Sequence, residues 1–553
     1  MPPNSGDQNV DSDVEEKDDI VSSDDELYEP AGELEIDVSG SSDSDGEASQ
    51  PVGVSSGKQS ASSRSGWRKK TEFTSDMQES LLENLENTHP ELAGLSPYEI
   101  WEKIFTPEII GLIVDQTNLF ANRDKNKPNF HTNECEILAF LGIIILSGYH
   151  TLPEERLYWS TRPDFGVPIV SSAMTRNKFQ ELKSMIHFAD NNMLPQGNKM
   201  AKVQPLFDLL NASLKQYGIF HEKLSVDESM VPYFGRHSAK QYIRGKPIRY
   251  GYKIWCLCGN DGYPYKLELY QGKVPNQPAL PLGTRVVSNL MNVVVEKSDP
   301  KKHELYIDNF FTSHDLLLSL RKENIKTTGT IRDNRTGGAT KLMENVASMR
   351  KKDRGHFDYR CDGEVYICRW HDNSVVTIAS NHQTHIPVAE ARRRVKGASG
   401  CLVKQPHLIK QYNEGMGGVD LMDRLLGSYR PRILGKKWYW SLFLNALNTS
   451  VVVAWRIHTK FADNNLSHLD FRSEVSLCLL KSVPSRTSFK RPRMSSFPDD
   501  VRFDGFDHYK AKTTTGRCKV CKKNTNYQCT KCLVRLHYDR ATTCSVTYHT
   551  KPE

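Results

Sequence analysis

The sequence of 553 residues lacks an apolar run long enough to cross a lipid bilayer. Its longest strongly apolar run extends from Ile137 to Leu146, whereas a membrane-spanning helix needs about 20 apolar residues. The first residues also lack a basic segment followed by an apolar stretch, which is the pattern of a secretory signal. These absences predict a protein that neither spans a membrane nor is secreted.

Basic residues are almost missing from the start of the chain. Residues 1–60 contain 17 Asp and Glu but only Lys17 and Lys58, so their net charge is −15, while the remaining chain carries +21. Large apolar side chains are scarce there too, and such a segment buries too little surface to offset the entropy lost on ordering. We expect residues 1–89 to form an acidic, disordered region. The basic remainder suggests a polyanionic partner, first of all nucleic acid, although a solubilising tail on an ordinary globular protein would give the same charges.

The 12 cysteines do not suggest a disulfide framework. Seven are scattered between Cys135 and Cys478, and five gather between Cys518 and Cys544 among histidines. Scattered cysteines without a secretory signal are typical of a reducing compartment. The terminal group therefore indicates a metal site.

Two C-x2-C pairs followed by mixed Cys and His are typical of structural zinc. The ligand candidates, with the histidine that would complete two tetrahedral sites, are Cys518, Cys521, Cys529, Cys532, His537, Cys544, His549 and His508. A cross-brace would pair Cys518 and Cys521 with His537 and Cys544. The second ion would be bound by Cys529, Cys532 and His549, completed by His508 or Asp539. We expect two structural Zn²⁺ in residues 508–553, which are too few to fold on apolar burial alone.

Hydrophobic periodicity divides the middle of the chain into helical and strand-rich parts. Residues 96–219 have a helical pattern that opens with Ser96 as N-cap and Pro97 as the first helical residue. Strands are expected at 224–231, 252–258, 265–270, 304–308, 364–370 and 374–379. Further helices are expected at 314–323, 418–425 and 438–459. The fold class is therefore α/β.

Three aspartates occupy positions where a charge is costly. Asp227 lies inside an apolar strand, Asp308 ends another, and Asp420 follows two glycines at the start of a helix. An ionised carboxylate at the edge of a core needs a partner or a metal, and three that converge would suit two Mg²⁺ ions and in-line phosphoryl transfer. Taken singly, each could instead cap a helix or accept a hydrogen bond in a turn. Asp423 shares the helix face of Asp420 and could support it or lie at the surface, whereas alternation places Glu228 on the opposite strand face from Asp227.

Basic residues crowd the stretch after Asp227, with tyrosines between them. Beside a metal site they would bind DNA phosphates, although a solvated charged face has the same composition. The candidate DNA contacts are Arg236, Lys240, Arg244, Lys246, Arg249 and Lys253, with Lys436 and Lys437 from a second cluster. The tetrad at 490–493 is a weak nuclear import signal, and a nuclear location is expected mainly from the DNA chemistry.

Four segments resemble the piggyBac-type transposases of the DDE superfamily. They are Ser225–Arg236, Gly245–Lys253, Tyr306–Ser313 and Tyr412–Asp420, and the Cys/His tail also matches. The resemblance runs from about Pro97 to His549. It implies that the three catalytic aspartates are Asp227, Asp308 and Asp420.

The resemblance also implies an RNase H-like catalytic core interrupted by a β-rich insertion. The implied boundaries are 90–222 and 426–500 for a helical dimerisation and DNA-binding domain, 223–330 and 408–425 for the core, 331–407 for the insertion, and 508–553 for the zinc domain. It further implies a homodimer and a tail that recognises the terminal repeats of a transposon.

Three functions are weighed from the sequence. The first is a Mg²⁺-dependent DNA transposase that cleaves double-stranded DNA through a hairpin intermediate and transfers strands at TTAA targets, as the resemblance implies. The second is a domesticated, transposase-derived nuclear DNA-binding protein without cleavage activity. The third, a chromatin or ubiquitin-type adaptor built on the zinc module, leaves the preceding 400 or so residues without a purpose.

Overall fold

The computed structural model describes residues 66–74, 76–77, 80–272, 280–395, 398–461, 466–482, 502–539 and 543–550. The acidic segment 1–60 and the basic tetrad at 490–493 lie outside the described residues, so the predictions about them stay predictions. Within the described part of the chain, no helix has both the length and the apolar character needed to cross a membrane.

The helical pattern expected for residues 96–219 is confirmed. The helices there are α2 (Pro97–Ile104), α3 (Pro107–Leu119), α4 (Glu134–Leu146), α5 (Pro168–Ala173), α6 (Arg176–Met185) and α7 (Gln204–Leu214), after the short α1 (Leu85–Thr88). Helix α2 begins as predicted, because Ser96 accepts a hydrogen bond from the Glu99 amide while the Glu99 carboxylate accepts one from Ser96. Helix α4 is buried over most of its length.

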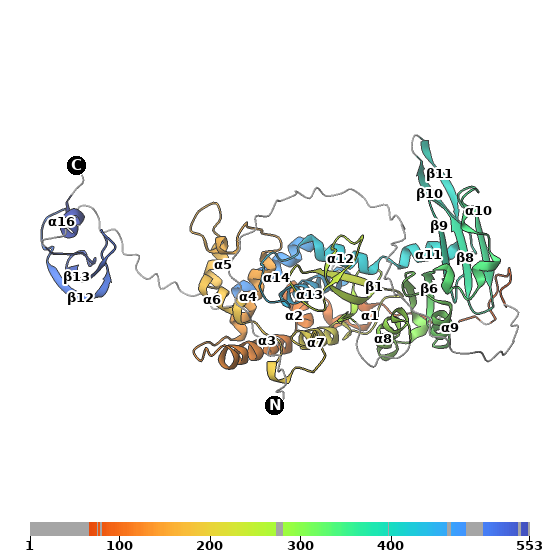
Figure 1. Cartoon of the computed structure of the whole chain (residues 1–553), viewed down its shortest axis with the longest axis horizontal. Coiled ribbons are helices and arrows are strands. Elements are labelled where there is room, and N and C mark those ends of the chain that lie inside the picture. The colour runs from red at the N-terminus through yellow and green to blue at the C-terminus, as the bar shows by residue number, and fades with distance from the viewer. Residues whose placement is uncertain are drawn as a thin grey trace, which may run out of the picture. The chain divides into compact units, whose positions relative to one another are not determined.

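Residues 223–380 contain a mixed, nine-stranded sheet, of which β1, β6, β8 and β9 are labelled in Figure 1. Its strands are β1 (Lys223–Pro232), β2 (Gln241–Tyr242), β3 (Tyr250–Gly259), β4 (Pro264–Leu269), β5 (Glu304–Ile307), β6 (Lys326–Thr330), β7 (Phe357–Cys361), β8 (Tyr366–His371) and β9 (Val375–Ser380). The order is β2-β3-β1-β5-β6-β9-β8-β7, with β4 paired to β3. Strand β1 is antiparallel to β3 and parallel to β5, and β5 is parallel to β6.

The strands of the expected insertion extend this sheet instead of forming a separate one. Strand β9 pairs antiparallel with β6, and β8 and β7 follow it. This pairing covers the edge of β6, whose backbone groups would otherwise lack partners. Strands β10 (Ala389–Val395) and β11 (Ala398–Gln405) form a separate two-stranded ribbon beside it (Figure 1).

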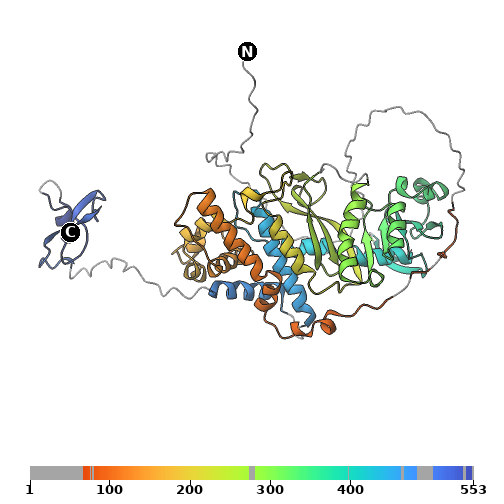
Figure 2. The ribbon, with the colours of Figure 1, turned by 90° about the horizontal axis from the view of Figure 1, so that it is seen from below.

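Helices distant in sequence complete the body. They are α8 (Leu282–Lys297), α9 (His314–Lys322), α10 (Val346–Met349), α11 (His407–Gly415), α12 (Gly418–Ser428), α13 (Trp440–Phe461) and α14 (His468–Lys481). Helix α14 packs on α4 and α13 packs on α2. In Figure 2, α13 and α14, in blue, lie among the orange N-terminal helices. The two helical segments expected to form one domain therefore share a core.

Part of the region expected to be disordered is ordered. Trp67 is buried against Leu317 and Ile331, and its indole N–H donates to the Gly337 carbonyl at 2.9 Å. Arg68 forms a pair of backbone hydrogen bonds with Cys361. Expecting disorder up to residue 89 is therefore wrong for residues 66–74 and for α1, because Trp67 supplies the apolar anchor that the preceding residues lack.

The Cys/His segment folds around a small core of its own. It contains the antiparallel strands β12 (Lys510–Arg517) and β13 (Asn524–Cys529) and the helix α16 (Cys544–His549). Four of its cysteines are buried in that core.

Candidate functional site

Asp227 and Asp308 lie at neighbouring positions of two parallel strands. In the register of β1 and β5, Val226 pairs with Ile307, and the two aspartates follow these residues directly. Because the strands are parallel, their carboxyl ends meet at the same edge of the sheet. Asp308 also forms a turn, since its Oδ1 accepts the Phe310 amide at 2.9 Å. Asp308 therefore both shapes a turn and lies next to Asp227.

Helix α12 brings Asp420 to the same place. A Cβ atom on Gly418 would lie 2.4 Å from the Gly259 carbonyl oxygen and 2.6 Å from Oγ of Ser225. Only glycine therefore allows the start of α12 to approach β1 and β3 this closely. Asp420 lies in the first turn of the helix, while Gly417 is the N-cap residue and no side chain caps the helix. The alternative that Asp420 merely caps the helix is wrong.

Asp423 ties α12 to the central strand. Its Oδ1 accepts a hydrogen bond from the Ser229 hydroxyl of β1 at 2.5 Å. Burial, together with the charge of Asp420, raises the pKa of Asp423 to about 6. Asp423 therefore faces the core beside Asp420 rather than the surface. Sequence reasoning missed Ser229, although its two-residue spacing from Asp227 places both on one strand face.

The carboxylates interact through their charges. Burial and the charges of Glu228, Asp308 and Asp420 raise the pKa of Asp227 well above its ordinary value. Burial and the charge of Glu228 raise the pKa of Asp308. Confined carboxylates of like charge are costly unless a cation compensates them. We refer to Asp227, Glu228, Asp308, Asp420 and Asp423 as the acidic site.

Glu228 lies near the aspartates, although strand alternation places it on the opposite face of β1 from Asp227. Its Oε1 lies 3.4 Å from Nζ of Lys246, and its charge acts on both Asp227 and Asp308. The expectation that Glu228 is not itself a metal ligand stays a prediction.

The acidic site fits divalent cations by its donors and charge. Carboxylate oxygens are the ligands that Mg²⁺ prefers, and a bound cation would offset both the burial and the neighbouring charges that raise the pKa of Asp227 and Asp308. The carboxylate oxygens of Asp227, Asp308 and Asp420 do not form one compact group of ligand atoms. Among the described residues, the groups whose ligand atoms all lie within 4.8 Å of one another consist of Cys and His only.

The candidate DNA contacts differ in their availability. Arg236, Arg244, Arg249 and Lys436 are exposed. Their side chains form no ion pair or hydrogen bond with the described residues. Lys240 is bound to the Gly235 carbonyl at 2.8 Å.

Other predicted contacts are engaged inside the protein. Nζ of Lys253 lies 4.3 Å from the centre of the Trp255 ring. Nζ of Lys437 donates to the Ile186 carbonyl at 2.7 Å and lies over the Phe120 ring. These lysines hold elements together, so their DNA contacts stay a prediction. A stacked pair, His237 and Trp438, links the basic stretch to the segment before α13, with ring centres 4.2 Å apart.

The Cys/His segment contains the two ligand groups predicted by the cross-brace. One group is Cys518, Cys521, His537 and Cys544, and the other is His508, Cys529, Cys532 and His549. Of the two candidates for the eighth ligand, the geometry therefore favours His508 over Asp539, which is exposed and lies outside both groups.

The three histidines are oriented as zinc ligands require. Each places one ring nitrogen on an acceptor outside the cluster, at the Asp504 carboxylate, the Asn524 carbonyl and the Ser545 carbonyl for His508, His537 and His549 respectively. Such contacts set the tautomer and leave the other nitrogen for a metal. Nε2 of His549 is buried and has no hydrogen-bond partner among the described residues.

Among the thiols, Cys518 favours metal binding, whereas burial and neighbouring thiols raise the pKa of Cys532 and of Cys544. Burial opposes ionisation of Cys518, but the backbone N–H groups of Cys521, Val520 and His537 lower its pKa to about 6. The thiolate is the form that binds zinc. The residues present therefore fit two Zn²⁺ ions.

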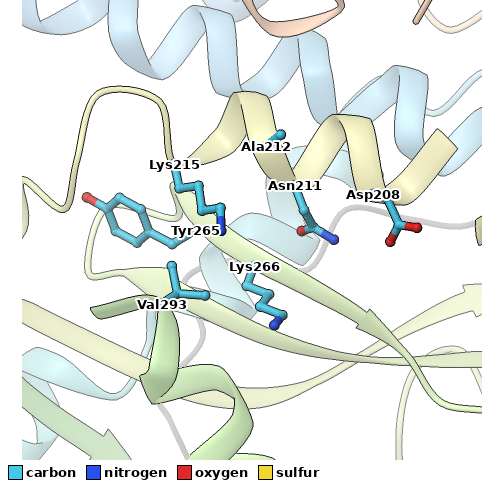
Figure 3. A pocket seen from close by; sticks show the side chains of 7 residues that line it. All are labelled: Asp208, Asn211, Ala212, Lys215, Tyr265, Lys266 and Val293. Carbon is cyan, nitrogen blue, oxygen red and sulfur yellow. The ribbon is translucent and has the colours of Figure 1, made fainter. Parts of the chain in front are cut away.

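A polar pocket of about 240 Å³ lies between α7, β4 and α8, and none of its lining residues belongs to the acidic site or to the Cys/His segment (Figure 3). Two of its polar side chains have partners in the protein: the Asn211 amide is hydrogen-bonded to the backbone of Leu267, and Lys215 pairs with Glu296 at 3.1 Å.

Comparison with known proteins agrees with the resemblance seen in the motifs. Residues 96–455 match the family model described as Transposase IS4. Human PiggyBac transposable element-derived protein 3 is 38% identical over 464 residues, covering 82% of this chain and 76% of that protein. Human PiggyBac transposable element-derived protein 2 is 36% identical over 436 residues, covering 77% and 72%.

A solved structure shares the fold. The cryo-EM structure of a piggyBac transposase synaptic complex with hairpin DNA matches with a TM-score of 0.59 at 20% identity, covering 78% of this chain and 96% of that chain. With the sequence matches over most of the chain, this settles the resemblance found in the motifs: the chain belongs to the piggyBac-type transposase family.

Proposed function

We propose that the protein is a DNA transposase whose acidic site cleaves and joins DNA strands with Mg²⁺. The observation that carries the proposal is the meeting of Asp227, Asp308 and Asp420 from two parallel strands and a helix, close enough for the charges of Asp308 and Asp420 to act on Asp227. The relative solved in complex with hairpin DNA supports a hairpin pathway. TTAA targets and a nuclear location belong to the same proposal.

The strand order supports an RNase H-like core. Strands β4, β3 and β1 form an antiparallel meander, and β5 and β6 continue it in parallel with β1. Asp227 lies on the central strand of these five, and Asp308 directly follows its parallel neighbour. This arrangement places two of the three aspartates where the sheet itself holds them rigidly.

The side chains divide the work of binding and chemistry. Asp227, Asp308 and Asp420 would hold two divalent cations, which when bound stabilise the charge that develops on the phosphodiester oxygens. Arg236, Arg244 and Arg249 have free guanidinium groups that bind DNA phosphates and keep the strand in line. Ser229 and Asp423 hold the helix that carries Asp420 against the sheet.

Excision of a plasmid-borne element with the matching ends tests the proposal. Wild type should excise the element, and Asp308→Asn should abolish excision while still binding the ends, because one ligand charge is lost and the side chain keeps its shape. Asp315→Asn serves as a matched control, since the Asp315 side chain is fully exposed on α9, and it should excise as wild type does.

The alternative is a domesticated DNA-binding protein that no longer cuts. The human relatives are named transposable element-derived proteins, which favours retaining this alternative. Wild type that binds the ends but excises nothing would establish this alternative. The presence of all three aspartates favours the transposase.

We also propose that residues 508–553 bind two Zn²⁺ and recognise the terminal repeats, and that the protein acts as a homodimer. The basic side chains around the ligands, among them Arg517, Lys519 and Lys523, suit a phosphate backbone. Affinity for the ends should therefore fall steeply with salt. An affinity insensitive to salt would contradict a phosphate-dominated interface.

A further inference from the structure

Lys246 reaches into the acidic site from the loop between β2 and β3. Its Nζ lies 3.4 Å from Oε1 of Glu228, and the two side chains are 30% and 14% exposed. The charges of Asp227, Asp420 and Asp423 also act on the ammonium group. Its neighbours Arg244 and Arg249 are exposed and form no ion pair with another described residue. Lys246 therefore differs from the basic residues around it.

The acidic site needs such a cation when no metal is bound. It gathers five carboxylates from β1, from the end of β5 and from α12, four of them at least partly buried and Asp420 exposed, and partly desolvated charges of like sign repel one another. One partly buried ammonium group, placed among them, offsets part of this repulsion. Removing a single partner from a desolvated ion pair leaves the remaining charge uncompensated. The ammonium group thus takes the electrostatic role that a divalent cation would take.

We propose that Lys246 is the resident counter-cation of the acidic site, that it competes with divalent cations for these carboxylates, and that bound DNA draws it away. The inference rests on the proposed function, because it takes the acidic site as the place where divalent cations bind. An ammonium group and a metal ion of the same sign repel each other, so each lowers the other's occupancy of the site.

A DNA phosphate beside the site changes this balance. It offers Lys246 a new partner of opposite charge, and the carboxylates are then free for metal ions. Binding of DNA and of divalent cations must then favour each other by the same factor, because such coupling is reciprocal. The site would hold cations weakly without DNA and tightly with it.

Mn²⁺ binding to the full zinc-loaded chain without DNA tests the competition. Measured by electron paramagnetic resonance, Lys246→Met should bind Mn²⁺ at least about tenfold more tightly than wild type, equivalent to about 1.4 kcal/mol of lost repulsion. Lys246→Arg keeps the charge and should bind as wild type. Lys240→Met is the matched control, because the Lys240 ammonium contacts a carbonyl, and it should leave the Mn²⁺ affinity unchanged.

The outcomes separate this inference from the proposed function. An unchanged or weaker Mn²⁺ affinity in Lys246→Met would overturn the competition while the cation site stands. Absence of Mn²⁺ binding in wild type and variant alike would overturn the cation site, and the inference with it. A second measurement uses wild type alone and so does not depend on whether the variants fold. A duplex carrying the element ends should raise the Mn²⁺ affinity of wild type about tenfold. An unchanged Mn²⁺ affinity would refute the release of Lys246 by DNA.

Discussion

Single residues in this protein carry more than one physical task. Asp308 shapes a turn through the Phe310 amide and also contributes a charge to the acidic site. Lys437, a candidate DNA contact, also has a structural task, since it donates a hydrogen bond to the Ile186 carbonyl inside the helical core.

The ring of His187 is also buried in the helical core, stacked on Phe120 with ring centres 4.3 Å apart. Its two nitrogens contact the Tyr439 hydroxyl and the Asn191 side chain.

The buried imidazole makes stability depend on pH. Burial and the charge of Lys437 lower the pKa of His187 to about 4, while the unfolded chain protonates it near pH 6.5. The unfolded state therefore binds more protons between these values, and stability falls as the pH drops through this window. Urea unfolding should show a loss of about 2 kcal/mol from this group between pH 7 and pH 5.

The variant His187→Gln isolates this contribution. It should be less stable than wild type at pH 7 but lose less stability on acidification. Equal losses in the two proteins between pH 7 and pH 5 would contradict the assignment to His187.

At the scale of elements, the contact between α12 and the sheet decides whether the acidic site is assembled. The glycine at the start of the helix allows the close approach to β1 and to the turn after β3. The hydrogen bond between Ser229 and Asp423 then fixes the rotation of the helix. These two contacts hold Asp420 near enough to Asp227 for its charge to act there.

A methyl group at Gly418 should separate the helix from the sheet. In Gly418→Ala the new Cβ would collide with backbone at Gly259, so the free energy of unfolding should fall by about 1–3 kcal/mol, with a severe loss of excision. Gly427→Ala is the control on the same helix, because a Cβ there meets nothing within 4 Å. It should be neutral or stabilising by up to about 1 kcal/mol. Similar behaviour of the two variants would show that the contact does not position Asp420.

Residues 66–74, which we call the strap, are held against the rest of the protein by Trp67. Trp67→Ala removes a buried indole and its hydrogen bond to Gly337, so the strap should detach and trypsin should cut after Arg68 to Lys70 at least about tenfold faster, since local opening controls proteolysis. Leu81→Ala is the control, because Leu81 is 93% exposed. An unchanged cleavage rate in Trp67→Ala would show that the indole does not hold the strap.

At the scale of the whole molecule, the body and the Cys/His segment are stabilised by different forces. The body has an apolar core that joins helices from both ends of the sequence with the sheet. The Cys/His segment has only a few buried apolar side chains beside its cysteines, so the proposed zinc binding would supply most of its folding free energy.

Native mass spectrometry should find two Zn²⁺ per chain. Cys521→Ser should lose one ion, because it removes one of four ligands from a single group. Cys478→Ser should keep both, since Cys478 is an exposed free cysteine outside the clusters. A chelator should unfold residues 508–550 and leave the thermal transition of the body in place. A zinc-free protein after gentle purification would contradict the assignment.

The sequence by itself determined the features that depend on neighbours along the chain. The C-x2-C pairs, the N-cap at Ser96 and the strands that carry Asp227 and Asp308 were predictable, because steric preferences and hydrogen bonds within a few residues decide them. The choice of acids at these positions also follows from the motifs of the family.

Tertiary structure alone decided which distant side chains meet. It joined the insertion strands to the central sheet, paired Lys246 with Glu228 near the aspartates, engaged Lys437 inside the core, and placed His508 rather than Asp539 with the second group of candidate zinc ligands. None of these contacts leaves a local pattern, because each depends on how elements separated by many residues pack. Charges and metal ligands interact through space, so their partners are set by the fold and not by spacing along the chain.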